Sequence, residues 1–239
     1  MISLRLAAER HHDRRLKREV WRTFDPTDRT DRRADRFRAL EALDESRLPP
    51  RADVPRRFGD EGEIVTYVRE GTVAYDDSTG HAGVIHAGEF QRMTAAHGAR
   101  HSEANASRVD WAHVFQIRIR RSMPELEPGR EQKRFSAAER RGGLCVVASP
   151  DARGGSLRLG QATWIYSALL EPGQHVVHEL APAHAAWLHI VQGEVTLDDL
   201  VLTTGDGAGV TTERAVSLIS RADSEILLFD LAEGKARGP

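Results

Sequence analysis

A strand–glycine–strand pattern occurs twice in this chain, and it is the feature that most restricts the possible folds. The first copy is IVTYVREGTVAYDD, with Gly71 at the turn, and the second is WLHIVQGEVTLDD, with Gly193 at the turn. A glycine–acid pair follows each copy, Gly88–Glu89 in the first and Gly205–Asp206 in the second. Because repetition of one supersecondary unit indicates a duplicated structure, we expect two similar β-barrels in one chain.

The remaining segments favour an all-β fold. EIVTYV, which starts at Glu63, is rich in β-branched and aromatic residues. VDWAHVFQIRIR alternates, with Phe115, Ile117 and Ile119 on one side and Gln116, Arg118 and Arg120 on the other. RFRALEALDE has no decisive period, so residues 36–45 form either a short helix or a strand. Short strands separated by glycine turns predict a sandwich or a barrel.

The domain boundaries follow from a change in composition. Residues 121–141 contain two prolines, a glycine and many charges, which predicts a linker with a short helix in SAAERR. We therefore expect an amino-terminal barrel at 1–120, a carboxy-terminal barrel at 142–232 and a tail at 233–239.

Composition excludes several classes of function. The formal net charge of −2 argues against direct nucleic-acid binding, which needs a basic face. The charge-rich region 1–50 is either a solvated segment with compensating charges or a polyanion-binding arm. Cys145, the single cysteine, excludes an intramolecular disulfide and is expected as a small buried residue in LCVVAS. With neither a long apolar run nor a visible signal peptide, we expect a cytoplasmic protein without membrane contact.

Histidine and acidic residues supply the candidate metal ligands. In RHSEAN, His101 and Glu103 are two residues apart on an expected strand, so their side chains point the same way. A metal site needs three or four ligands, so this pair alone is incomplete. His175 and His178 are three apart, which places them on opposite faces of a strand, and we expect them, His184 and His189 to be surface or core residues.

The segment AGEFQRMTAAHGARHSEANAS resembles the signature of the pirin family, and the likeness extends from about residue 1 to 231. It is strongest to bacterial bicupins described as quercetin 2,3-dioxygenases. The resemblance implies two cupin barrels packed face to face and a single metal, usually iron, in the amino-terminal barrel. In the family, a His-x-His pair and the His and Glu of an H-S-E segment hold this metal. The last two map onto His101 and Glu103.

The His-x-His pair does not map. Counting back from EIVTYV without a gap, its two positions are Arg57 and Gly59. Glycine offers no ligand, and arginine is a fixed cation that has no lone pair to donate. We therefore expect a degenerate site without a cofactor, in which the Arg57 guanidinium replaces the metal and pairs with Glu103. If a cofactor is bound, a single divalent transition metal, iron first, is the expectation.

Two alternatives stay open at this stage. His97 or Glu61 completes a remodelled metal site with His101 and Glu103, and the protein is then a flavonol dioxygenase with Glu103 as the candidate base. Otherwise His101 and Glu103 act as a cofactor-independent pair. The expected partner of a degenerate site is a small molecule or another protein, bound by Arg57, His101 and Glu103. The oligomeric state is open, and a monomer is compatible with the sequence.

Overall fold

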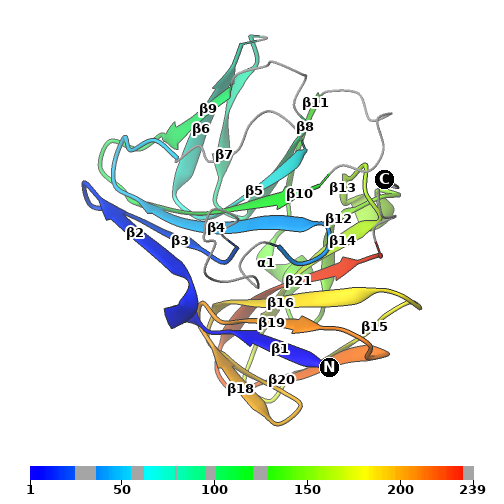
Figure 1. Cartoon of the computed structure of the whole chain (residues 1–239). Helices are drawn as coiled ribbons and strands as arrows, with labels where there is room; N and C mark the ends of the chain where they lie inside the picture. Colours follow the sequence, from blue (N-terminus) through cyan, green and yellow to red (C-terminus); the bar gives the residue numbers. More distant parts are fainter. Residues whose placement is uncertain (25–35, 55–61, 79, 95–100, 121–128, 234–239) are drawn as a thin grey trace, which may run out of the picture. The chain divides into compact units, whose positions relative to one another are not determined.

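The computed structural model describes residues 1–24, 36–54, 62–78, 80–94, 101–120 and 129–233. These residues form strands β1 to β21, the short helix α1 (Ala137–Arg140) and two turns of 3₁₀ helix at Ala7–Glu9 and Arg153–Gly155 (Figure 1). The predicted all-β class is confirmed. Of residues 36–45, which the sequence left open between helix and strand, residues 40–45 belong to the strand β4 and none is helical. Among the described residues, no helix has the length and apolar character needed to span a membrane.

The amino-terminal unit comprises His11–Arg36 and Leu40–Phe135. Its seven-stranded sheet has the order β11-β8-β5-β10-β4-β3-β2, and its three-stranded sheet has the order β7-β6-β9. The strands are β2 (His11–Arg15), β3 (Arg18–Arg22), β4 (Leu40–Leu48), β5 (Glu63–Glu70), β6 (Thr72–Asp77), β7 (Ala82–His86), β8 (Glu89–Thr94), β9 (His101–Asn105), β10 (Ala112–Ile119) and β11 (Gly129–Arg134).

The carboxy-terminal unit comprises Met1–Arg10, Phe37–Ala39 and Ser136–Pro239. It has a seven-stranded sheet of order β1-β19-β16-β21-β14-β12-β13 and a four-stranded sheet of order β15-β20-β17-β18. The strands are β1 (Ile2–Arg5), β12 (Cys145–Ser149), β13 (Leu157–Arg158), β14 (Thr163–Leu170), β15 (His175–Glu179), β16 (Ala185–Gln192), β17 (Glu194–Leu197), β18 (Leu200–Thr203), β19 (Gly207–Val210), β20 (Ala215–Ser220) and β21 (Ser224–Leu231).

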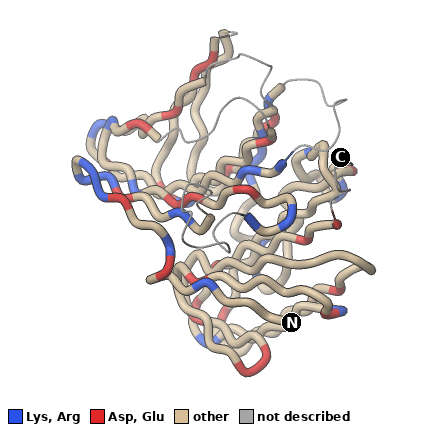
Figure 2. The backbone as a smooth tube through the Cα atoms, viewed as in Figure 1, with Lys and Arg blue, Asp and Glu red and all other residues tan. Residues whose placement is uncertain are grey.

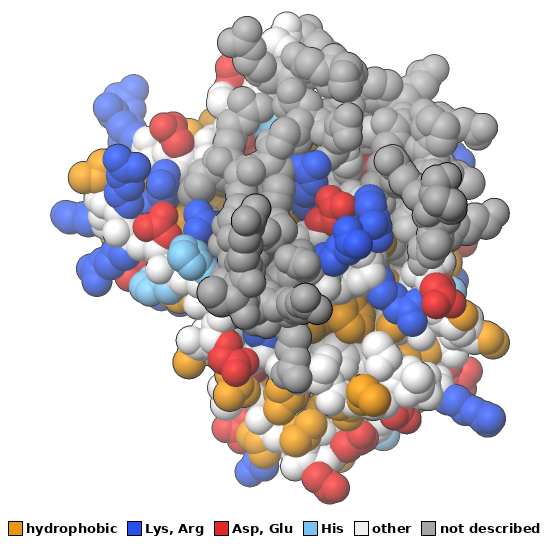
Figure 3. All heavy atoms as spheres, in the orientation of Figure 1, with side chains coloured by type: hydrophobic (Ala, Val, Ile, Leu, Met, Phe, Trp, Pro, Cys, Tyr) orange, Lys and Arg blue, Asp and Glu red, His pale blue; other side chains and the backbone are white. Residues whose placement is uncertain are grey.

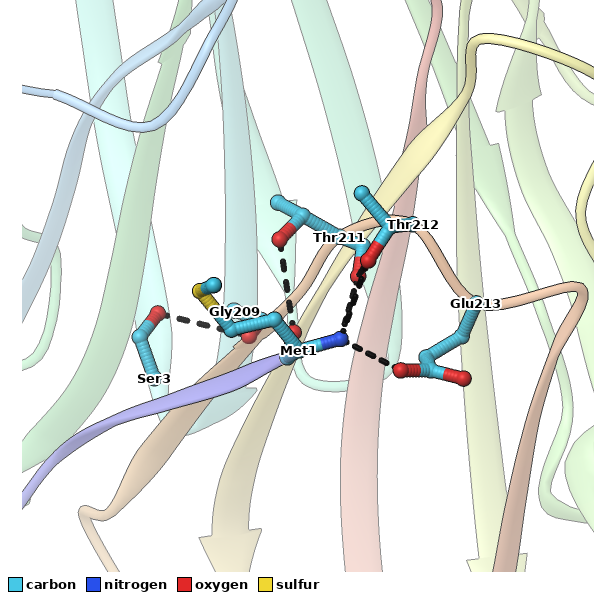
Figure 4. Close-up of polar contacts among 6 residues, drawn as sticks. All are labelled: Met1, Ser3, Gly209, Thr211, Thr212 and Glu213. Carbon is cyan, nitrogen blue, oxygen red and sulfur yellow. Dashed lines mark hydrogen bonds and ion pairs between the residues drawn. The ribbon is translucent and has the colours of Figure 1, made fainter.

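The first strand belongs to the second half of the chain, a division that differs from the expected barrel at 1–120. β1 pairs antiparallel with β19, with Ile2 opposite Val210. Figure 4 shows the Met1 ammonium group 2.6 Å from the carbonyl oxygen of Thr211 and in contact with the Glu213 carboxylate. Composition could not reveal this pairing, because an edge strand is assigned by its backbone partner and not by its own side chains.

The expected linker at 121–141 also contains regular structure. Within it, β11 pairs antiparallel with β8 at the edge of the amino-terminal sheet. The predicted short helix is confirmed as α1, whose N-cap Ser136 forms a capping box with Glu139. In the described part of this stretch, the charged residues therefore lie on a paired strand and at the end of a helix. The prolines at 124 and 128 lie outside the described residues.

The two turn glycines occupy equivalent places, which confirms the internal repeat. Gly71 joins β5 to β6 and Gly193 joins β16 to β17, so each carries the chain from a seven-stranded sheet to the smaller one. Their φ angles are +76° and +93°. A Cβ would lie 2.5 Å from the Trp111 carbonyl oxygen at Gly71 and 2.5 Å from the Asp223 carbonyl oxygen at Gly193. Both turns therefore require glycine, for conformation and for space.

Each unit encloses its own apolar core between its two sheets. In the amino-terminal unit the core residues are Leu48, Val54, Val68, Val73, Ile85, Ala112 and Val114. In the carboxy-terminal unit a larger core draws on both sheets and includes Ile226 and Leu228 of β21. The alternation predicted for β10 is confirmed, since Phe115, Ile117 and Ile119 are fully buried. Their polar neighbours point to the opposite face, the one that carries Val114 and the barrel core.

Charge is unevenly spread over the amino-terminal unit. The hairpin of β2 and β3, His11–Arg22, holds five Lys or Arg residues and two acidic ones. Figure 2 colours this hairpin largely blue, and Figure 3 shows basic side chains projecting at the same left-hand edge. Basic residues therefore outnumber acidic ones within this hairpin of the charge-rich region 1–50. The expected lack of nucleic-acid binding stays a prediction.

Candidate functional site

The candidate site lies on β9, the strand that contains HSEAN. β9 pairs with β6, which sets Glu103 opposite Tyr75 and His101 opposite Asp77. Residues 101, 103 and 105 share one face of the strand because strand side chains alternate. Glu103 is 5% exposed, so its carboxylate lies inside the barrel, whereas His101 is only partly buried.

Two neutral side chains from the large sheet hold the Glu103 carboxylate. Gln116 Nε2 on β10 donates to Glu103 Oε2 at 2.8 Å, and Thr66 Oγ1 on β5 donates to Glu103 Oε1 at 3.3 Å. Both oxygens are therefore hydrogen-bonded, which lowers the cost of burying the carboxylate. The bonds also fix the side chain at a defined place between the two sheets.

These donors belong to a polar row that crosses the large sheet on its barrel face. Directly paired residues of an antiparallel sheet share a face. The register joins Gln116 to Thr66, Thr66 to Gln91 and Gln91 to Gln132, and on the other side Gln116 to Asp44. The row lies beside the apolar core, so the barrel interior has an apolar part and a polar part. Sequence reasoning missed the row because each strand contributes a single residue.

Arg130 closes the polar part of the barrel. From β11, its Nη1 donates to Gln91 Oε1 at 2.8 Å and its Nε contacts Asp77 Oδ2 at 3.2 Å. The guanidinium carbon lies 4.5 Å from the centre of the Tyr75 ring. Its Nη2 atom is buried and has no hydrogen-bond partner within the described ranges. Asp77, the last residue of β6, therefore forms an ion pair with β11.

Asn105 completes the strand as a structural residue. Its side-chain amide donates to the backbone oxygens of Leu48, Pro49 and Asp110 at 2.8–3.1 Å, and its Oδ1 accepts from the Ser107 amide. The last residue of the HSEAN motif therefore anchors the ends of neighbouring segments.

The described residues do not by themselves fit a complete metal site. Of the family ligand positions, His101 and Glu103 are described, and both Glu103 oxygens already accept hydrogen bonds. Within the described ranges, no three His, Cys, Asp or Glu side chains are grouped so that they could hold an ion. The other predicted site residues, Arg57, Gly59, Glu61 and His97, lie outside the described residues. Their proposed roles stay predictions.

The histidines of the second half lie as the strand pattern predicted. His175 is exposed and its Nε2 lies 2.8 Å from Ser217 Oγ, while His178 points to the other face and contacts Asp230. His184 also contacts Asp230, and His189 is fully buried. Sequence reasoning missed Asp230, because it lies next to the last residue of β21, a largely apolar strand far along the chain from His178.

Comparison with known families decides the identity of this pair of barrels. The family model "Pirin" matches residues 8–119, and the model "Quercetinase C-terminal cupin domain" matches residues 146–231. A protein named quercetin 2,3-dioxygenase from Escherichia coli strain K12 is 38% identical over 234 residues, which cover 97% of this chain and 99% of that protein. The chain belongs to the pirin family. It is a bicupin, and the resemblance drawn from the HSEAN segment is confirmed.

Solved structures of pirins agree with this assignment. The crystal structure of YhhW from Escherichia coli superposes with a TM-score of 0.90 at 37% identity, over 97% of each chain. The structure described as bacterial pirin YhhW in complex with nickel(II) gives a TM-score of 0.88 at 36% identity, over 97% of this chain and 99% of that chain. A protein named putative quercetin 2,3-dioxygenase from Pasteurella multocida is 32% identical over 82% of this chain. Pirin relatives of this chain therefore include proteins named for flavonol oxidation.

Proposed function

We propose that this pirin is a binding protein whose amino-terminal site has lost the family's metal-dependent oxygenase chemistry. One observation carries the proposal: the sequence has Arg57 and Gly59 where the family has its His-x-His pair, whereas Glu103 is retained inside the barrel. Loss of two ligands from a set of four leaves too few for tight binding of a catalytic ion.

Electrostatics supports an arginine in place of the ion. A buried carboxylate that loses its metal needs a compensating charge, since an unpaired buried ion is strongly destabilising. The Arg57 guanidinium is always charged and can bond a carboxylate through two parallel N–H groups. It also repels a divalent cation. In this proposal Arg57 pairs with Glu103, and the bonds from Gln116 and Thr66 hold the carboxylate in position for that pairing.

The polar row supports a ligand with hydroxyl or anionic groups. Gln116, Gln91 and the carboxylate of Glu103 offer both donors and acceptors on one face, and the apolar core lies next to them. Arg130 adds a buried N–H group that has no partner in the described part of the chain. A small molecule with polar groups at one end and an apolar body suits such an interior. The other candidate ligand is a segment of a partner protein bound at the same place.

The competing function is a metal-dependent flavonol dioxygenase. The names of the Escherichia coli and Pasteurella multocida relatives favour it, as does the nickel(II) complex of YhhW. It requires Glu61 or His97 to complete a remodelled set with His101 and Glu103. The metal would then bind and orient the flavonol as a Lewis acid, and Glu103 would accept a proton. A cofactor-independent reaction on the His101–Glu103 pair is a weaker third candidate.

Metal analysis of the purified full-length chain separates the first two functions. The protein is expressed in medium supplemented in turn with iron, nickel, copper and zinc, and its metal content is measured together with oxygen uptake on quercetin. We expect well below one metal ion per chain and no flavonol-dependent oxygen uptake. A near-stoichiometric transition metal accompanied by quercetin turnover would establish the dioxygenase and overturn the proposal.

A further inference from the structure

The carboxy-terminal barrel contains a polar cluster that the proposed function does not use. Asp230, on β21, points to the same face as the core residues Ile226 and Leu228, because alternate residues of a strand share a face. It is 6% exposed. His178 Nε2 lies 2.8 Å from Asp230 Oδ2, and His184 Nδ1 lies 2.6 Å from Asp230 Oδ1. One buried carboxylate therefore binds two imidazoles, one through each oxygen.

This arrangement fixes the tautomer of each imidazole in its neutral form. An ionised carboxylate can only accept, so the nitrogen that faces Asp230 carries the proton in each imidazole. In the neutral rings, His178 Nδ1 and His184 Nε2 are then left with lone pairs. Neither atom has a hydrogen-bond partner within the described ranges. The cluster thus offers two oriented acceptors, the arrangement by which a carboxylate prepares a histidine base.

Aromatic rings frame these acceptors. The ring centre of Tyr166 is 4.8 Å from that of His178, and the ring centre of Trp164 is 5.5 Å from that of His184. Arg153 lies across both, with its guanidinium carbon 5.4 Å from the centre of the Trp164 ring and its Nη2 donating to the Tyr166 hydroxyl at 3.0 Å. Flat side chains with a cation beside them favour a planar ligand over a flexible one.

A second, independent observation points to a ligand. Trp164 Nε1 is buried and has no hydrogen-bond partner in the described part of the chain. A buried N–H without an acceptor costs about 1–3 kcal/mol, so such atoms call for an explanation by water or ligand. The unpaired donor belongs to the same indole that packs against His184.

We infer that this cluster is a second binding site, for a small hydroxylated aromatic compound. A phenolic hydroxyl both donates and accepts, so it can donate to an imidazole lone pair and accept from the Trp164 N–H. A catechol offers a second hydroxyl for the other imidazole, so we expect it to bind more tightly than a phenol. The rings of Trp164 and Tyr166 contact the ligand ring. The site is in the other barrel from Glu103, so it does not depend on the proposed function.

The test uses catechol and phenol as probes on the full-length chain, measured by calorimetric titration and by the imidazole ¹⁵N resonances. We expect saturable one-to-one binding, tighter for catechol, with shifts at His178 and His184. The substitutions His178→Gln and His184→Gln should each weaken catechol binding about tenfold, the cost of one lost hydrogen bond. Trp164→Phe, which removes the indole N–H donor together with the five-membered ring and keeps a six-membered aromatic ring, should weaken it as well.

His175→Gln is the matched control, because His175 lies on the same strand as His178 and points to the opposite face. It should leave catechol binding unchanged, and thermal unfolding of each variant shows whether the fold is retained. The inference would be overturned if the wild-type chain showed no saturable binding, if the His175 variant showed an equal loss, or if binding were lost only on Glu103→Gln. Stoichiometric zinc binding that depends on His178 and His184 would also overturn it, in favour of a metal site.

Discussion

Gln116 and Glu103 face each other across the interior of the amino-terminal barrel, joined by a 2.8 Å hydrogen bond from Nε2 to Oε2. Gln116 belongs to the seven-stranded sheet and Glu103 to the three-stranded sheet. The bond therefore links the two sheets at the place where the family positions a metal ligand. It keeps a buried carboxylate satisfied by neutral donors, whatever else the site contains.

Removing this donor should destabilise the chain. Gln116→Leu removes the hydrogen bond from Gln116 to Glu103 Oε2, at a cost of about 1–3 kcal/mol in the free energy of unfolding. Urea denaturation followed by circular dichroism measures the change. Ser102→Ala on the exposed face of β9 is the control, and its effect should stay below about 0.5 kcal/mol. Equal effects of the two substitutions would contradict the role assigned to Gln116.

Restoring the histidine pair should restore metal binding. In the double variant Arg57→His with Gly59→His, the family ligand positions again hold three histidines and Glu103. We expect metal content to rise from well below one ion toward one ion per chain, because a complete ligand set replaces an incomplete one. Arg57→His alone is the control for simple removal of the cation. A wild-type chain already loaded with metal would show that the site is not degenerate.

Replacing Gly71 or Gly193 with alanine should destabilise the chain far more than the same change at other glycines of similar φ. Gly193→Ala places a Cβ 2.5 Å from a backbone oxygen and should lower the free energy of unfolding by more than about 2 kcal/mol. Gly173 has a φ of +82° with no atom within 4 Å of a Cβ, so Gly173→Ala reports the conformational cost alone. That cost is about 1 kcal/mol. Similar losses at both positions would show that close approach is not what fixes Gly193.

The single cysteine should react slowly below pH 9. Burial, aided by the nearby Glu139 carboxylate, raises the pKa of the Cys145 thiol. Since a raised pKa means that the folded state holds the proton more tightly, the associated stability is fully present below the ordinary thiol pKa. It is lost as the pH rises through the folded-state pKa. Iodoacetamide labelling against pH should show a midpoint above that of the urea-unfolded chain. A midpoint at or below the unfolded value would contradict this environment.

Local chemistry made much of the fold predictable. The repeated strand–glycine–strand pattern reflects a requirement for positive φ at Gly71 and Gly193. Such a requirement is visible in the sequence because a single residue type, glycine, meets it best. The alternation around Phe115 likewise follows from the two-residue period of a strand. The pairing of His101 with Glu103 on one face needed only their spacing.

What the tertiary structure decided are relationships between strands. β1 joins the sheet of the second half through backbone bonds, which leave no mark in its side chains. Gln116 reads locally as the polar side of a half-buried strand, yet it points into the barrel because the three-stranded sheet, with Glu103, covers that face. Asp230 contacts His178 and His184, which lie 52 and 46 positions away in sequence. The sequence alone determined which faces each strand has, because side-chain periodicity is local. Only the fold decided which strands meet, because register and closure depend on the packing of the whole barrel.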